Sequence, residues 1–168
     1  MNISKFKKWN NLIGFITFLI AFTTYSLTVE PTASYWDAAE YISTSAKLQV
    51  GHPPGAPFFQ MLGAFFASFA SNPDQIAFMV NMMSVFASAF TILFLFLTIT
   101  IIGKKIVLKN NSISNSNAII ILGSSLIGSL CFTFSDSFWF NAVEAEVYAM
   151  ATMIMALLFW LGFKWEEN

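Results

Sequence analysis

Long uncharged apolar stretches dominate the pattern of this sequence. A helix of about 20 apolar residues is long enough to cross a bilayer, and four stretches reach roughly that length. The pattern predicts an all-α fold: a polytopic membrane protein whose residues 1–168 form a single membrane domain. We expect its transmembrane helices at about 10–29, 76–102, 118–135 and 142–163.

The composition agrees with a membrane protein and excludes a nucleic-acid-binding one. Hydrophobic residues make up 57% of the chain and charged residues only 10%, against roughly a quarter charged in soluble domains. All eight basic residues are lysines, so no guanidinium group is available. Without a basic patch we expect no nucleic acid as a partner, and membrane lipids as the surroundings.

The apolar segment 58–70 is too short to be assigned from length alone, and the lysines decide its placement. If it spanned, three lysines would face the cytoplasm and five would face outward; if not, seven would face the cytoplasm and only Lys47 outward. Cytoplasmic loops are richer in lysine, so we expect a membrane-hugging segment. The outer loop is then 30–75, the cytoplasmic loop 103–117, and both termini lie on the cytoplasmic side of the cell inner membrane.

The outer loop contains a predicted amphipathic helix at about 35–49. On a 3.6-residue period its polar face carries Asp37, Glu40, Thr44 and Lys47, with small and apolar residues on another face. Such a helix is expected to lie flat on the membrane surface as a juxtamembrane helix.

Asp37 and Glu40 are the candidate catalytic residues. One ionised carboxylate could take a proton from an acceptor hydroxyl while the other orients that hydroxyl or binds a cation. A structural role is equally compatible with the pattern. Ser34 could cap the helix with Asp37 in its first turn, where a negative charge is favourable, and Glu40 could pair with Lys47.

His52 stands at the start of a rigid turn, residues 52–57, with the sequence HPPGAP. Proline fixes φ and glycine permits a sharp bend, so the imidazole is held in place. It could bind a phosphate or donate to a leaving group, or it could be structural. No second histidine and no Cys/His cluster accompanies it, so we expect no zinc site. The carboxylates leave a divalent cation such as Mg²⁺ open.

A second acidic pair, Glu144 and Glu146, precedes Tyr148 at the outer end of the last predicted helix. Ionisable groups at a membrane helix suggest a function. A structural alternative is a capping box formed by Asn141 and Glu144. If both glutamates are helical, they point about 200° apart, and at most one can face an enclosed cavity.

Three segments together resemble the N-terminal part of a GT-C superfamily glycosyltransferase. They resemble, more narrowly, a bacterial membrane family related to a eukaryotic transmembrane protein O-mannosyltransferase. The segments are WDAAE at 36–40, LQVGHPPGAP at 48–57 and EAEVY at 144–148. The glycine that often precedes the glutamate in this family is Ala39 here.

The resemblance implies an inverting transfer of a sugar from a polyprenyl phosphate carrier to a protein or glycan acceptor on the outer side. Asp37 would be the general base and Glu40 would assist it. Substrate binding would involve His52 near the donor phosphate, together with Lys47, Glu144, Glu146 and Tyr148. GT-C enzymes have more spanning helices than the four expected here, so the resemblance also implies an N-terminal fragment that would not catalyse alone.

Two other functions compete with the glycosyltransferase. A transporter or channel component could use the outer carboxylates as an ion or proton site, although such carboxylates are expected near the bilayer midplane. A non-catalytic structural membrane protein could use the same carboxylates as helix caps.

Overall fold

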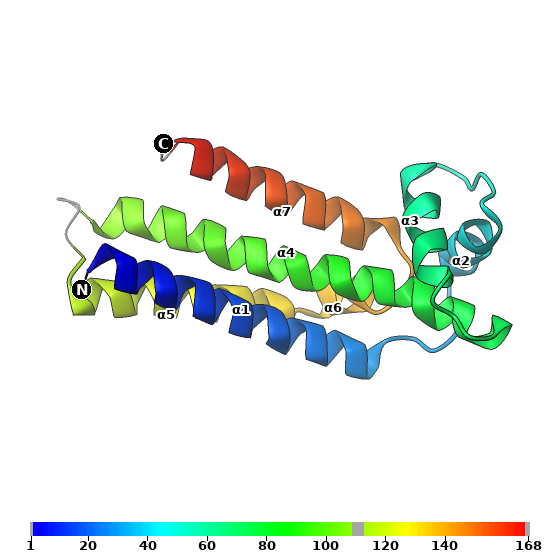
Figure 1. Ribbon diagram of the computed structural model, residues 1–168, viewed down its shortest axis with the longest axis horizontal. Coiled ribbons are helices and arrows are strands. Elements are labelled where there is room, and N and C mark those ends of the chain that lie inside the picture. The colour runs from blue at the N-terminus through cyan, green and yellow to red at the C-terminus, as the bar shows by residue number, and fades with distance from the viewer. Residues whose placement is uncertain (1, 109–112, 167–168) are drawn as a thin grey trace.

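The protein is a bundle of long helices with short helices across one end (Figure 1), as described by a computed structural model for residues 2–108 and 113–166. The helices in chain order are α1 (Ile3–Thr28), α2 (Ala38–Lys47), α3 (Phe58–Ala67), the 3₁₀ turn η1 (Pro73–Gln75), α4 (Ile76–Val107), α5 (Asn115–Thr133), α6 (Asp136–Ala142) and α7 (Val147–Glu166). Within the described residues, α1, α4, α5 and α7 are long and apolar enough to cross a membrane. The predicted all-α fold with four spanning helices is confirmed.

Helix α4 is the centre of the bundle and packs against α1, α5 and α7. Its buried face carries many small side chains, including Ser84, Ala87, Ser88 and Ala89. Small residues let helix backbones approach closely where no water-driven force holds the helices together. The small side chains therefore allow α4 to pack closely against three neighbouring helices.

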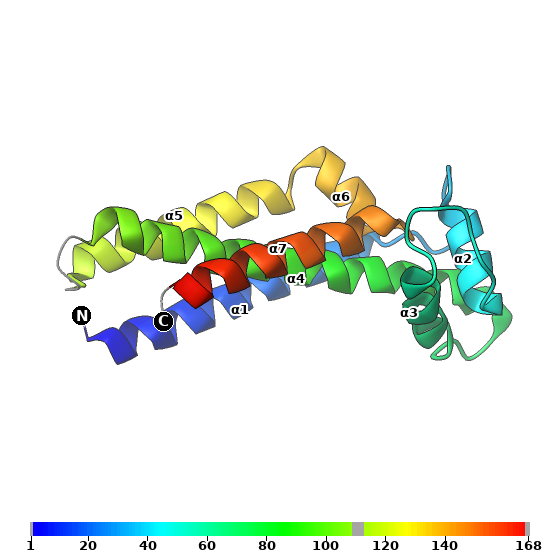
Figure 2. The same cartoon turned by 90° about the horizontal axis from the view of Figure 1, so that it is seen from above.

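Helices α2 and α3 lie crosswise at one end of the bundle, next to the start of α4 (Figures 1 and 2). The ten residues of α3 extend only about 15 Å, half of a hydrocarbon core of about 30 Å. A hydrophobic cluster joins these helices to α4 and α7; its buried members are Tyr41, Ile42, Phe59, Val80, Met83, Ala145, Val147 and Met150. The short segment therefore packs as a crosswise cap on the bundle, too short to be a fifth span.

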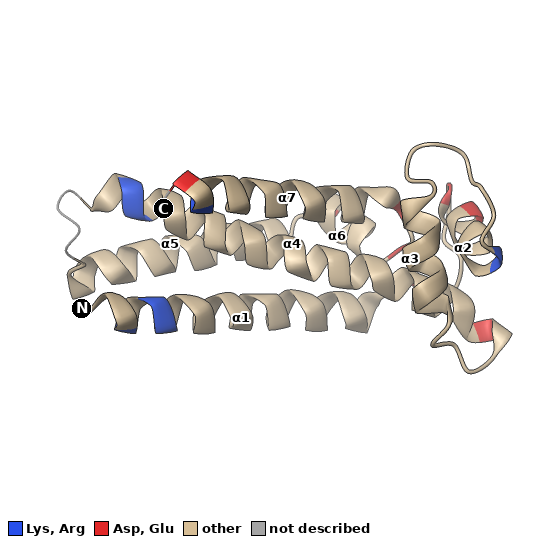
Figure 3. Cartoon of the chain, turned by 45° about the horizontal axis from the view of Figure 1, so that its top comes forward, with Lys and Arg blue, Asp and Glu red and all other residues tan. Residues whose placement is uncertain are grey.

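Both ends of the described chain lie at the opposite end of the bundle from α2 and α3 (Figure 1). The described lysines gather at that end in α1, α4 and α7, whereas Lys47 lies with most of the acids at the other (Figure 3). Lys109 lies outside the described residues. The charge asymmetry inferred from the sequence is thus also an asymmetry between the two ends of the bundle.

The first three long helices begin or end a few residues beyond the expected spans, at Ile3, Val107 and Asn115. Two other predicted helices are shorter than expected. The helix expected over 35–49 is shorter, because Trp36 and Leu48 have positive φ angles of 63° and 49° and interrupt it at both ends. The last spanning helix begins at Val147 instead of residue 142, because the preceding residues form α6 and a non-helical link. Thr44 also departs from the predicted polar face: it is buried, and its hydroxyl donates to the Glu40 carbonyl at 2.8 Å.

Candidate functional site

His52 joins the two carboxylates of α2. Its ring Nδ1 lies 3.0 Å from Oε2 of Glu40, and its Nε2 lies 3.4 Å from Oδ2 of Asp37. The backbone N–H of His52 also donates to Oε1 of Glu40 at 2.8 Å. The structure therefore brings together Asp37, Glu40 and His52, which we name the Asp–Glu–His cluster.

The chain reaches this geometry by reversing direction after α2. Leu48 adopts a left-handed conformation that ends α2. The backbone then returns along the side of this helix and comes close to it at Gly51. A Cβ at Gly51 would lie 3.1 Å from Nε2 of Gln60 and 3.3 Å from Oε1 of Glu40. Glycine lets the backbone pass here without displacing the ends of these two side chains, and this places His52 directly beside Glu40.

The following turn is held against the last spanning helix. Gly55 has φ +116°, and a Cβ there would lie 2.6 Å from Cγ1 of Val147, the first residue of α7. Phe59, in the first turn of α3, donates its N–H to the Gly55 carbonyl at 2.9 Å. The histidine turn is thus fixed between α3 and α7, which connects the first loop of the chain to its last helix.

Within the Asp–Glu–His cluster, the contacts between Glu40 and His52 favour the charged form of each side chain. Hydrogen bonds from the His52 backbone and ring hold the pKa of Glu40 below its ordinary value. The hydrogen bond to Glu40 in turn raises the pKa of His52, with a further contribution from the Asp37 charge. The side chains of Asp37, Glu40 and His52 remain 57%, 44% and 41% exposed, so the cluster is open to a ligand.

Tyr41 extends the cluster into the protein interior. Its hydroxyl lies 3.5 Å from Nε2 of His52, and the two rings are 5.4 Å apart at their centroids. Burial raises the pKa of Tyr41, and the charges of Glu146 and Asp37 add to this shift. Tyr41 was not among the residues expected at the site, because a buried aromatic residue beside a glutamate gives no functional signal in a helical pattern.

The second acidic pair lies in the link between α6 and α7, so the predicted helical geometry of these residues is wrong. Glu144 and Glu146 are only 3% and 6% exposed, and the Glu146 N–H donates to the Glu144 carbonyl at 2.9 Å in a tight turn. Asn141 is no cap for α7: it belongs to α6, where its amide donates to the Ser137 carbonyl.

The two buried glutamates have different surroundings. The Ser34 hydroxyl donates to the Glu144 carboxylate, so Ser34 contacts this acid rather than capping α2. Burial raises the pKa of Glu144 despite that hydrogen bond. Burial also raises the pKa of Glu146 to about 7, with smaller contributions from the charges of Glu144 and Asp37. Glu146 is therefore placed to exchange a proton near neutral pH.

A network of backbone and amide hydrogen bonds places the two acidic pairs relative to each other. The buried Asn81 amide of α4 donates to the carbonyls of Glu30 and Thr32 at 2.7 and 2.9 Å. The Glu30 N–H donates to the Val143 carbonyl at 2.9 Å. The chain leading to Asp37 is thereby joined to α4 and to the link that carries Glu144 and Glu146.

Lys47 and Tyr148 are less closely associated with the Asp–Glu–His cluster. Lys47 is exposed in the last turn of α2, at the opposite end of the helix from Asp37, which directly precedes its first turn. Tyr148 is 59% exposed in the first turn of α7 and lines a cavity of about 240 Å³ beside α6. Among the described residues, neither side chain has a hydrogen bond or ion pair to the cluster. Those residues also include no group of three or more His, Cys, Asp or Glu arranged to hold a metal ion.

Comparison with known proteins places this arrangement in a family. The family described as "Protein O-mannosyl-transferase TMEM260 N-terminal domain" matches residues 37–168, which include both acidic pairs and His52. No solved structure matches the chain significantly.

Two curated relatives agree with that match. The chain is 30% identical to "Protein O-mannosyl-transferase tmem260" of Dictyostelium discoideum over 148 residues, 88% of this chain and 16% of the relative. It is 27% identical to "Protein O-mannosyl-transferase TMEM260" of Mus musculus over 143 residues, 85% of this chain and 18% of the relative. The chain thus spans less than a fifth of the length of each, and it belongs to the family of the TMEM260 N-terminal domain.

Proposed function

We propose that the chain forms the N-terminal part of a membrane glycosyltransferase that transfers a sugar, with mannose as the first candidate, to an acceptor hydroxyl. The donor is a polyprenyl phosphate sugar, and the acceptor is a protein or a glycan. The observation that carries the proposal is the Asp–Glu–His cluster at one end of the bundle, within the part of the chain that matches the family.

Asp37 is proposed as the general base. Its carboxylate is the most exposed of the cluster and, within the described part of the chain, has a polar contact only to His52, at 3.4 Å, so it can accept a hydrogen bond from an incoming hydroxyl. As the acceptor oxygen forms its bond to the anomeric carbon, Asp37 takes the hydroxyl proton. The bond from that carbon to the phosphate oxygen breaks, and the polyprenyl phosphate leaves with the electron pair. Attack opposite the leaving group inverts the anomeric centre.

Glu40 is proposed to position His52, and His52 is proposed to carry a positive charge in the site. Both carboxylate oxygens of Glu40 are committed to His52, which leaves Asp37 as the carboxylate available for the acceptor. The raised pKa of His52 favours its cationic form. A cation held between two carboxylates lowers their mutual repulsion and reduces the negative charge that a donor phosphate would meet at the open side of the cluster. Lys47, in the last turn of the same helix, is proposed to supply a further positive charge.

Glu144, Glu146 and Tyr148 are proposed to bind the sugar. Buried carboxylates accept hydrogen bonds from sugar hydroxyls strongly in a site with little water. Glu146 can do so in its charged or its neutral form near pH 7, while the exposed Tyr148 offers a ring and a hydroxyl at the edge of the same end of the bundle.

The proposed orientation places the acidic end on the outer side of the cell inner membrane and both termini in the cytoplasm. Lysine-rich segments remain cytoplasmic, and the end that holds both termini carries nearly all described lysines (Figure 3). A transport function fits this arrangement less well, because the acidic pairs lie at the end of the bundle rather than near its midplane.

The test is transfer of labelled mannose from a polyprenyl phosphate carrier to acceptor in membranes containing the full-length protein. Asp37→Asn keeps the shape of the side chain and removes the base, so transfer should fall by roughly 10² to 10⁴-fold. Asp74→Asn is the matched control, because Asp74 lies at the same end in η1 outside the cluster. Normal transfer by the correctly inserted Asp37→Asn variant would overturn the assignment, and a chelator added to the same assay reveals any need for a divalent metal.

A further inference from the structure

At the end of the bundle that holds both termini, far from the acidic pairs, a cavity of about 400 Å³ opens between α1, α4 and α7. Three lysines from three different helices line it: Lys7, Lys104 and Lys164. None of the described residues that line it is acidic, and Glu166, which is not among them, is paired with Lys105 at 2.5 Å. The cavity therefore has a positive lining that no single helix provides.

The rest of the lining is suited to an amphipathic ligand. Phe6, Leu97, Ile101 and Trp160 form apolar walls, and Asn10 and Asn11 add amide groups near Lys7. The Asn10 carboxamide oxygen is buried without a hydrogen-bond partner in the described structure. A buried acceptor of this kind calls for a donor, and Asn10 lines the cavity in which a headgroup hydroxyl would lie.

We propose that this cavity binds the headgroup of an anionic phospholipid, with a glycerol headgroup as the best match. The phosphate contacts the three ammonium groups, the headgroup hydroxyls contact the asparagines, and the start of an acyl chain follows the apolar walls. Basic pockets between spanning helices bind anionic headgroups elsewhere, and a bundle end is where headgroups lie in a bilayer. Lys104 and Lys164 are not without partners in the chain, so the lipid adds to their contacts.

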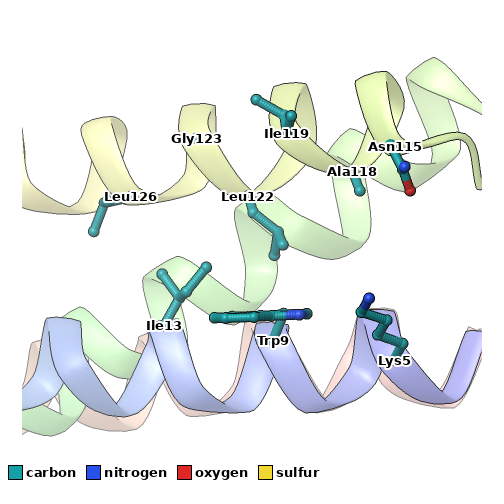
Figure 4. A pocket seen from close by; sticks show the side chains of 9 residues that line it. All are labelled: Lys5, Trp9, Ile13, Asn115, Ala118, Ile119, Leu122, Gly123 and Leu126. Carbon is teal, nitrogen blue, oxygen red and sulfur yellow. The ribbon is translucent and has the colours of Figure 1, made fainter. Parts of the chain in front are cut away.

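A nearby groove between α1 and α5 (Figure 4) has fewer lysines in its lining than this cavity. Its cavity of about 500 Å³ is lined by Trp9, Ile13, Leu122 and other mainly apolar residues, with Lys5 as its charged member. Lys5 and Lys7 are two residues apart on α1, yet they line different cavities. Lys8, the next residue along the helix, lines neither cavity.

The experiment measures lipid retention by the full-length protein, using native mass spectrometry during titration with phosphatidylglycerol or phosphatidylcholine. Lys7→Gln and Lys164→Gln should each weaken phosphatidylglycerol binding about fivefold, since a lysine near an anionic headgroup contributes about that factor. Lys7→Arg should retain binding, and Lys8→Gln should change it less than twofold.

Three outcomes would overturn the proposal. Equal losses in Lys5→Gln, Lys7→Gln and Lys8→Gln would mean that general surface charge attracts the lipid. Equal retention of phosphatidylcholine would mean that the cavity does not recognise the anion. Displacement of the lipid by millimolar inorganic phosphate would mean that a soluble anion, and not a lipid, is the ligand.

Discussion

Glu40 holds His52 by two separate contacts, one to the backbone N–H at 2.8 Å and one to the ring Nδ1 at 3.0 Å. The first contact fixes where the chain returns after α2, and the second fixes which way the imidazole points. Asp37, one helical turn earlier, meets only the other side of the ring. The two carboxylates are therefore not equivalent: one positions the histidine, and the other remains open to solvent.

The first prediction concerns the different roles of Glu40 and Asp37 toward His52. Glu40→Gln should lower the pKa of His52, because the hydrogen bond and charge of Glu40 are the main causes of its upward shift. The measurement is an NMR titration of the single histidine of the chain. Asp37→Asn should lower the same pKa by less. An equal or larger shift in Asp37→Asn would contradict the assignment of Glu40 as the positioning residue.

The second prediction concerns stability against pH. Glu146 has a pKa of about 7 in the folded protein against an ordinary value of 4.5, so the folded state binds more protons than the unfolded state between these values. Stability then falls as pH rises from 4.5 to 7. Glu146→Gln removes this titration, so its melting temperature should vary less over the window.

His52 provides an internal comparison for that measurement. Its raised pKa also makes stability fall with rising pH, but above its ordinary value of 6.5. Glu146→Gln should therefore flatten the stability profile mainly on the acid side and leave the decline above pH 6.5 in place. An unchanged slope between pH 4.5 and 6.5 would show that the Glu146 carboxylate is solvated in the folded protein.

The spanning helices could be predicted from the sequence because apolar length alone determines them in a bilayer. The same reasoning placed Asp37, Glu40 and His52 in one loop, and the structure brings them into contact. Their partner Tyr41 gave no such signal. Its position depends on how α2 turns its buried side toward α3 and α7, which is a consequence of tertiary packing.

The region before α7 could not be predicted from periodicity. Residues 138–143 are apolar or aromatic except for Asn141, and the long apolar run resumes at Val147, so the segment resembles the start of a membrane helix despite Glu144 and Glu146. The observed break at α6 depends on bonds to distant residues: the Val143 carbonyl accepts from Glu30, and the Glu144 carboxylate accepts from Ser34. Local sequence carries no information on such partners, which are more than 100 positions away.

The third prediction tests the hydrogen-bond network at Asn81. Asn81→Ala removes two donated bonds and leaves the carbonyls of Glu30 and Thr32 without these partners. We expect a loss of roughly 2–4 kcal/mol in the free energy of unfolding, at about 1–2 kcal/mol for each unsatisfied group. Thermal or denaturant unfolding of the purified protein in detergent provides the measurement.

Ser88→Ala is the control for Asn81→Ala. Ser88 is buried on the same helix, two turns further along, and its hydroxyl has no hydrogen-bond partner in the described structure. Removing it should change the free energy of unfolding by less than about 1 kcal/mol. Equal losses in both variants would mean that a change in α4 packing, and not the loss of the loop contacts, causes the effect.

The fourth prediction concerns the contact between the histidine turn and α7. Gly55→Ala places a Cβ 2.6 Å from Cγ1 of Val147 at a φ of +116°, where a side chain is strained even without a neighbour. The variant should be destabilised by roughly 1–3 kcal/mol. It should also move His52 relative to Asp37, so the pKa of His52 should shift toward its ordinary value.

Adding Val147→Ala to Gly55→Ala separates the two causes of that destabilisation. Val147→Ala removes Cγ1 and with it the clash, whereas the backbone strain at residue 55 remains. The double variant should therefore recover part of the lost stability, which a double-mutant cycle measures as a coupling energy. Gly123→Ala is the control for glycine replacement as such, because a Cβ at this helical position meets no heavy atom within 4 Å. It should be neutral or stabilising. Additive losses from Gly55→Ala and Val147→Ala would mean that the two residues do not touch, and the histidine turn would then have to be held by α3 alone.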